Sequence, residues 1–193
     1  MEIISRISLI LVFVLFFSGS PFSERKCVVR IDRGSELYLK GSANVKDFTC
    51  RYDQQLLETS VPIVFRKKEG RMIFDKALIR LENRGFGCGG RGINKDFHSL
   101  LQTESHPYID LRLREVIQEP GELKAKISIT IAGEQGDYEI PVKLQTEGVL
   151  KCSGVLSLDI RDFGLEPPKK MLGLIVVDEK IAIYFDLSLR IGS

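Results

Sequence analysis

Hydrophobic and polar residues alternate one by one over several stretches of the chain. The clearest run is 123–131 (LKAKISITI), where Leu, Ala or Ile takes every second position and Lys, Ser or Thr stands between them. Residues 180–190 (KIAIYFDLSLR) follow the same period, as do shorter runs at 37–39, 109–113 and 138–144. Because successive side chains of a strand point to opposite faces of a sheet, this pattern predicts strands with one buried face.

Turn-forming residues separate these runs. Clusters of Gly, Pro, Asp, Glu or Ser stand at 32–35, 68–70, 120–121, 133–137 and 147–148, and such residues favour turns. At 120–121 the Pro-Gly pair predicts a type II turn, because Pro presets the first central position and Gly accepts the positive φ of the second.

One helical pattern interrupts the strands, at residues 93–102. Phe97, Leu100 and Leu101 have the spacing of one helix face, and Asn94 is placed to cap the helix N-terminus. Many strands with one short helix predict an all-β fold, an antiparallel sheet that curls and closes. A parallel α/β sheet is excluded because strands and long helices do not alternate, and no Pro/Gly/Ser-rich linker divides the chain.

The start of the chain has the pattern of an export signal. Arg6 precedes eleven apolar residues at 7–17, and small residues follow at 18–20. This predicts a signal peptide over residues 1–22, cleaved between 18 and 23. A transmembrane anchor needs about 20 apolar residues, so we expect no stable membrane span and a single exported domain over 23–193.

Four cysteines, at positions 27, 50, 88 and 152, follow this segment. An even number of cysteines in an oxidising compartment predicts disulfides, and three connectivities are open. Neither a C-x-x-C nor an H-x-x-x-H spacing occurs, so a metal site is disfavoured.

Composition excludes some classes of function. The 193 residues are 44% hydrophobic and 28% charged, and the net charge is +2. This is the composition of an ordinary globular domain. Since no block of five like charges occurs, nucleic acid is an unexpected partner.

Signals for catalysis are weak. His98 and His106 are the only imidazoles, and no G-x-S-x-G elbow accompanies them. The G-x-G-x-x-G match at 85–90 lacks the parallel βαβ unit that a dinucleotide site needs, so its glycines are interpreted as turn residues. Asp159 and Asp162 flank a turn, where Asp is common. We therefore expect a protein that is not an enzyme and that has no metal.

The interior of such a barrel is the remaining candidate site. A barrel of about eight strands is either filled by side chains or holds one small ligand. The inward residues here are aliphatic, so a cavity would suit a chain or ring with little need for hydrogen bonds. Periodicity does not separate a cavity from a filled core.

Four ordered stretches together resemble the YceI-like family. They are 41–50 (GSANVKDFTC); 86–88 (FGC) running into 96–101 (DFHSLL) and 106–109 (HPYI); 129–133 (ITIAG) leading to 141–144 (PVKL); and 162–168 (DFGLEPP) followed by 173–175 (GLI). The resemblance implies a lipocalin-like, eight-stranded antiparallel barrel with one or two short helices, exported to the bacterial periplasm. It also implies an elongated apolar cavity, which in some members holds a polyisoprenoid-type lipid.

The resemblance further implies a disulfide pattern and a function. Cysteines at Cys50 and Cys88 look like one branch of the family, which pairs them and leaves Cys27 with Cys152. The implied function is carriage or storage of an apolar lipid, with no cofactor other than a bound isoprenoid or fatty-acyl lipid. The alternative is a filled barrel acting through its surface in envelope stress or assembly. A homodimer is left open.

The expected cavity lining combines the inward faces of the best alternating strands with two helix residues that close one end. These residues are Ile109, Leu111, Leu113, Ile127, Ile129, Ile181, Ile183, Phe185, Leu187, Phe97 and Leu101.

Overall fold

The computed structural model describes residues 24–146, 149–167, 169–170 and 175–192. The expected signal peptide over residues 1–22 lies outside this part of the chain. Within it, no helix is long and apolar enough to span a membrane.

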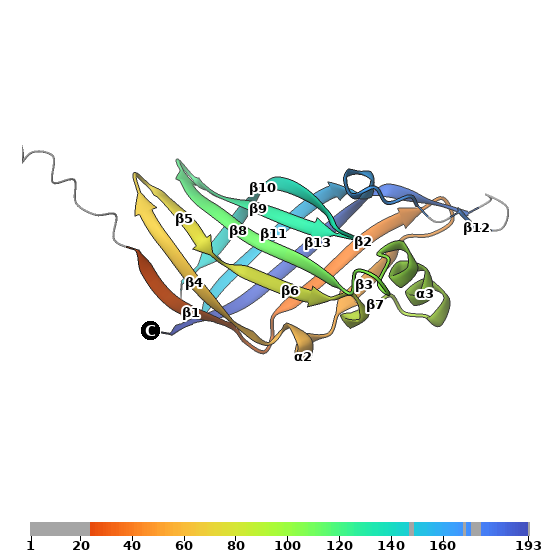
Figure 1. The fold of residues 1–193 in the computed structure, drawn as a ribbon, viewed down its shortest axis with the longest axis horizontal. Helices are drawn as coiled ribbons and strands as arrows, with labels where there is room; N and C mark the ends of the chain where they lie inside the picture. Colours follow the sequence, from red (N-terminus) through yellow and green to blue (C-terminus); the bar gives the residue numbers. More distant parts are fainter. Residues whose placement is uncertain (1–23, 147–148, 168, 171–174, 193) are drawn as a thin grey trace, which may run out of the picture.

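Antiparallel strands form a closed ring, which confirms the all-β barrel (Figure 1). The ring order is β1-β4-β5-β8-β9-β10-β11-β13, and β13 pairs with β1 to close it. The strands of the ring are β1 (Arg25–Ile31), β4 (Thr59–Lys68), β5 (Arg71–Lys76), β8 (Tyr108–Glu119), β9 (Glu122–Ile131), β10 (Glu134–Gln145), β11 (Leu150–Asp159) and β13 (Ile175–Gly192).

Shorter strands extend three of these into long, interrupted strands. β2 (Glu36–Ala43) continues β1 along the same edge of β13, and β3 (Phe48–Tyr52) precedes β4 with α2 (Gln54–Leu57) between them. β6 (Leu78–Glu82), η1 (Asn83–Gly85) and β7 (Phe86–Gly87) continue β5. The barrel is therefore an up-and-down meander, in which each long strand pairs with the next one along the chain.

The meander gives the barrel two different ends. We call the end with α3 (Arg91–Leu100), η2 (Ile160–Phe163) and β12 (Lys169–Lys170) the helical end. The hairpin end carries the turns at 69–70 and 120–121, the ends of β10 and β11, and the two ends of the described chain. Figure 1 shows the helical end at the right and the hairpin end at the left.

A buried polar cluster interrupts the first long strand. The Asp32 amide donates to the Ser188 carbonyl at 2.8 Å, and the Ser35 hydroxyl donates to the Asp32 carbonyl at 2.7 Å. The Ser188 amide donates in turn to the Ser35 hydroxyl at 2.9 Å. The turn predicted at 32–35 is confirmed at Arg33 and Gly34, where the Ser35 amide donates to the Asp32 carbonyl at 3.3 Å. The chain does not reverse at this turn, because the bonds to Ser188 join β1 to β2 and the strand continues along β13.

Tight hairpins join several strands. Glu69-Gly70 and Ala132-Gly133 both have positive φ at their two central residues, which is the geometry of type I′ turns. Gly121 has φ 82 after Pro120, as the expected type II turn requires. The turn predicted over 133–137 is too long, because β10 already begins at Glu134.

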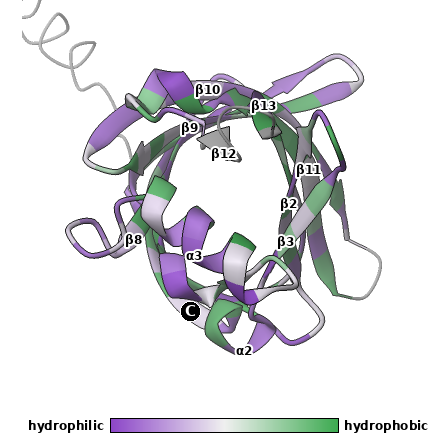
Figure 2. Ribbon diagram, turned by 90° about the vertical axis from the view of Figure 1, so that its right-hand side faces the viewer, coloured by the Kyte–Doolittle hydropathy of each residue, from purple (hydrophilic) through white to green (hydrophobic). Residues whose placement is uncertain are grey.

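The expected helix at 93–102 is confirmed as α3, two residues earlier. Its N-cap is Gly90, with no side-chain cap, so the prediction that Asn94 caps the helix is wrong. Asn94 lies one turn inside the helix, and its side-chain oxygen accepts from the Cys88 amide at 2.7 Å. The side chain thus fixes the loop that leads into α3. Viewed from the helical end, α3 lies across part of the rim of the ring (Figure 2).

Candidate functional site: the barrel interior

Packed side chains cover part of the interior at the helical end. Phe86 is 5% exposed, Leu101 5%, Phe163 1% and Leu165 3%, and all four belong to one hydrophobic cluster. They come from β7, the end of α3, η2 and the segment after η2. These elements pack against one another at this end of the barrel.

A disulfide holds the start of α3 to the barrel wall. Cys50 of β3 is bonded to Cys88, just before α3, as the family resemblance implied. Cys50 has no exposed surface. The Phe86 ring lies 4.8 Å from the Tyr52 ring and 5.5 Å from the Phe97 ring, centroid to centroid. The bond and the three rings fix α3 in place at the helical end.

The implied pairing of Cys27 with Cys152 is wrong, and both cysteines are free. Ile31, Leu189 and Leu150 lie side by side on β1, β13 and β11. Cys27 lies four residues from Ile31 toward the hairpin end, and Cys152 lies two residues from Leu150 toward the helical end. The two are thus about 20 Å apart along the strands, whereas a disulfide needs Cα atoms within about 7 Å.

At the hairpin end, inward side chains are exposed to solvent. Leu144 pairs with Cys152, and Cys152 pairs with Leu187, so Leu144 shares the inward face of β13. Leu144 is nevertheless 45% exposed, whereas Val142 one pleat deeper is 8% exposed. Ile191, opposite Val29 on the same inward face, is 65% exposed. In the part of the chain that the structure describes, the interior therefore opens at this end.

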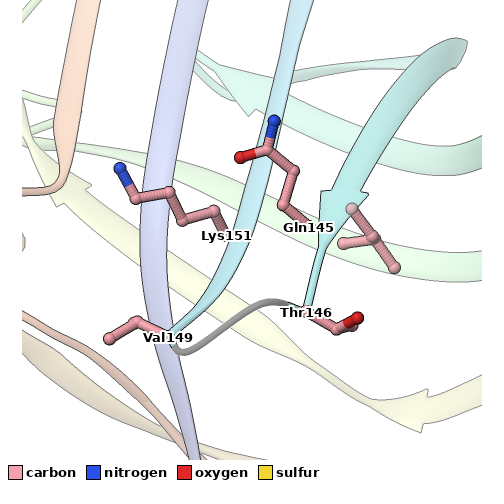
Figure 3. A pocket seen from close by; sticks show the side chains of 5 residues that line it. Gln145, Thr146, Val149 and Lys151 are labelled. Carbon is pink, nitrogen blue, oxygen red and sulfur yellow. The ribbon is translucent and has the colours of Figure 1, made fainter.

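A hollow of about 670 Å³ adjoins this opening (Figure 3). It lies beside the neighbouring ends of β10 and β11, and both apolar and polar side chains line it. The lining residues are Leu144, Gln145, Thr146, Val149 and Lys151.

All eleven residues expected to line a cavity belong to the same hydrophobic cluster. Ile109, Ile129 and Leu101 are fully packed, with 9%, 0% and 5% of their surface exposed. The other eight keep partial access to solvent. They are Leu111, Leu113, Ile127, Ile181, Ile183, Phe185, Leu187 and Phe97. The structure brings the predicted residues together; their contact with a ligand stays a prediction.

Sequence reasoning missed part of the wall. The inward, partly accessible face also includes Met72, Phe74, Ile79, Leu123 and Leu189. The pairing of β4 with β5 shifts in register between Val64 and Phe65. Because of this irregularity, the inward residues of this region do not follow one unbroken alternation in the sequence. Leu123 and Leu189 already lie within the alternating runs 123–131 and 180–190, on the same faces as residues of the expected lining.

Aromatic rings lie against glycines on the inner wall. Gly154 pairs with Phe185 across the strands, and a Cβ on Gly154 would lie 2.6 Å from the ring. Gly41 pairs with Phe48 in the same way, with the ring at 2.3 Å. Because glycine has no side chain, each ring lies flat on the wall and leaves more of the interior free.

The carboxylates considered for catalysis have structural partners. The Asp159 side chain accepts from the Arg161 amide at 3.0 Å and pairs with its guanidinium, which lowers the pKa of Asp159 to about 2. The Tyr138 hydroxyl donates to Asp162 at 3.1 Å. Partial burial and this bond raise the pKa of Tyr138 to about 12. These groups hold η2 against β10.

The remaining chemical candidates are also packed into the fold. Gly85 lies against the Tyr52 ring, where a Cβ would come within 2.6 Å, and Gly89 has φ 84. The glycines at 85–90 thus serve a crowded loop, as interpreted from the sequence. His106 lies beside Gly133, and His98 stands on α3 next to Phe97. Among the described residues, no three metal-ligating side chains gather.

The fold and interior define an eight-stranded meander barrel, with packed side chains at the helical end and exposed inward side chains at the hairpin end. No known family profile and no curated protein matches the sequence. BcnA of Burkholderia cenocepacia is similar in structure, with TM-score 0.56, 14% identity, and coverage of 83% of this chain and 99% of that chain. A polyisoprenoid-binding domain from Saccharophagus degradans, implicated in plant cell wall breakdown, has TM-score 0.53, 14% identity, and coverage of 86% and 98%.

A variant of the Campylobacter jejuni YceI protein matches with TM-score 0.50 and 9% identity, covering 90% of this chain and 86% of that chain. These comparisons show that the chain has the fold of YceI proteins. They agree with the barrel that the sequence resemblance implied.

Proposed function

We propose that the chain is a member of the YceI-like family and that its barrel holds the apolar chain of a lipid, for carriage or storage outside the cytoplasm. The observation that carries this proposal is the partial accessibility of inward side chains midway along the barrel. In a filled core such side chains lose their accessible surface, as Ile129 and Leu158 do, at 0% and 3% exposed. Leu111, Ile183 and Leu187 point inward yet stay accessible.

The chemistry of the wall suits a hydrocarbon. The inward positions of β9 hold only Leu, Ala and Ile, and those of 181–191 in β13 hold only Ile, Phe and Leu. Such walls offer a ligand dispersion contacts and no hydrogen bonds. Each methylene transferred from water contributes up to about 0.8 kcal/mol, so one five-carbon isoprene unit adds roughly 4 kcal/mol before the costs of association.

The difference between the hairpin end, where inward side chains are exposed, and the helical end, where they are packed, sets the direction of entry. A chain enters between Leu144 and Ile191 and extends toward the layer of Phe86 and Leu101. Affinity should therefore increase with chain length and level off when the chain reaches that layer.

The disulfide and the apolar N-terminal segment support export. Disulfides persist in oxidising compartments such as the periplasm, and Cys50 and Cys88 are bonded. The solved Saccharophagus degradans domain is described as binding polyisoprenoids, which supports the choice of ligand class.

Native mass spectrometry of the protein purified from its own compartment tests the proposal, followed by extraction and identification of what leaves with it. We expect one long-chain lipid per barrel. A mass without ligand that stays unchanged after addition of polyisoprenoids would overturn the proposal and favour a filled barrel.

A matched pair of variants locates the ligand. Ile183→Trp fills the inward face of β13 and should abolish uptake. Val155→Trp adds the same bulk on the outward face, where Val155 is 44% exposed, and should leave uptake unchanged. Equal uptake by both folded variants would place the ligand outside the barrel.

A further inference from the structure

Basic residues gather at the hairpin end of the barrel. The hairpin between β4 and β5 reads RKKEGR at 66–71, four basic residues out of six. Lys143 and Lys151 are exposed on β10 and β11, and Arg25 is exposed at the start of β1. Among the described residues of 24–28, 64–76, 115–126, 139–151 and 188–192, twelve are Lys or Arg and seven are Asp or Glu. This end is therefore more positive than the chain as a whole, whose net charge is +2.

Most acids at this end are paired. Lys124 lies 2.8 Å from Glu119 and 3.6 Å from Glu122. Arg66 binds Asp75 at 2.8 Å, and Glu115 contacts both Arg71 and Lys126 at 3.4 Å. Each pair neutralises a basic residue together with an acid, so the excess positive charge lies on the other basic residues, of which Lys67, Lys143 and Lys151 are exposed.

Exposed apolar side chains surround the same opening. Val28 is 42% exposed, Leu144 45%, Val149 49% and Ile191 65%. They come from β1, β10, the segment before β11, and β13, which are neighbours in the ring. They follow the rim of the barrel, and Leu144 and Val149 also line the hollow described above. At the helical end, by contrast, α3 and η2 cover part of the interior (Figure 2).

We propose that the hairpin end docks on the surface of an anionic lipid bilayer. A rim with basic and apolar side chains matches both components of such a surface, because the cations attract anionic headgroups and the apolar side chains insert at the acyl boundary. Docking would place the barrel opening against the lipid. This inference rests on the proposed function for its purpose, although binding to vesicles is measured without any reference to cargo.

Vesicle flotation with the mature protein tests the docking. The probes are vesicles of phosphatidylcholine alone and vesicles that also contain phosphatidylglycerol, because basic segments bind anionic lipid surfaces. We expect binding to the anionic vesicles only, with affinity falling as salt increases.

Charge reversal at the two ends supplies a matched control. The variant Lys67→Glu, Lys143→Glu, Lys151→Glu changes the hairpin end and should weaken binding by at least about 100-fold, because the loss of each basic residue near an anionic surface costs roughly fivefold and the added carboxylates are repelled. The variant Lys46→Glu, Arg91→Glu, Lys95→Glu makes the same change of charge at exposed positions of the helical end and should weaken binding less than fivefold. Ile191→Asp, which removes an apolar rim residue, should weaken binding at high salt as well.

Several results would overturn the docking. They are equal binding to neutral and anionic vesicles, equal losses in the two triple variants, or no vesicle binding. A dimer in sedimentation that Ile191→Asp dissociates, without vesicle binding, would assign the rim to a second copy. Lipid uptake is measured separately by native mass spectrometry without vesicles. Uptake without vesicle binding refutes docking alone, and charge-dependent vesicle binding without uptake refutes the proposed cargo alone.

Discussion

The Cys50–Cys88 bond allows a quantitative test of what stabilises the helical end. The bond joins residues 38 apart in the sequence. In the loop-entropy description of crosslinks, closing a loop of this size stabilises the native state by about 4 kcal/mol. Because the bond joins β3 to the segment before α3, its loss should also loosen α3 at the helical end.

Urea unfolding with and without reductant measures this contribution. We expect the free energy of unfolding of the wild type to fall by about 4 kcal/mol on reduction. The double variant Cys27→Ala, Cys152→Ala is the matched control and should show the same fall, since both residues are free thiols. Cys50→Ala, Cys88→Ala should show no effect of reductant. Hydrogen exchange in α3 should accelerate only where the bond is absent.

Two results would refute this reasoning. A reductant effect below about 1 kcal/mol in the wild type would mean that the unfolded chain gains little freedom from losing the crosslink. A reductant effect that disappears in Cys27→Ala, Cys152→Ala would mean that the bonding in solution differs from that in the structure.

Three further predictions concern the wall, η2 and the free thiol. Gly154→Ala should destabilise the fold by about 1–3 kcal/mol, because its Cβ meets the Phe185 ring. Gly92→Ala, with open space around it in α3, should stabilise the fold by up to about 1 kcal/mol. Thermal unfolding that ranks the two variants the other way contradicts the wall geometry. The hydrogen bond from Arg161 lowers the pKa of Asp159 to about 2, so the stability that Asp159 contributes is present above its unfolded pKa and is lost as the pH falls toward 2. The difference in unfolding free energy between wild type and Asp159→Asn should be constant above about pH 5, fall as the pH decreases and disappear below about pH 2, and a difference that is undiminished at pH 2 would count against the pairing. Burial raises the pKa of Cys152 to about 11, so its alkylation at pH 8 should be roughly 100-fold slower than that of a peptide thiol, as peptide mass spectrometry would show; an ordinary rate would place Cys152 outside the barrel.

The strands were predictable where one face of the sheet is buried and the other is exposed to solvent. The run 123–131 alternates without a break, and β9 occupies Glu122–Ile131. At residues 32–35 the composition correctly predicted a turn, but not that the strand continues beyond it. Only the distant Ser188 supplies the hydrogen bonds that splice the two halves of the strand together, and no local pattern announces such a partner.

The candidate site was predictable as a set of residues but not as a space. Alternation places Leu144, Val142 and Ile129 on one inward face, yet their exposed fractions are 45%, 8% and 0%. Those values depend on where neighbouring strands end and on which end the helix covers. For the same reason, the sequence left a filled barrel and a hollow one equally open.

The meander topology has a consequence for how the ring assembles. Every seam between long strands joins neighbours in sequence except the one where β13 meets β1 and β2, which brings Val28 opposite Gly192. Closing such a distant pair costs more chain entropy than forming a local hairpin. Until β13 pairs with β1 and β2, the first and last strands have unpaired edges that can template aggregation. The hydrogen bonds among Asp32, Ser35 and Ser188 lie in this seam and hold it together in the folded barrel.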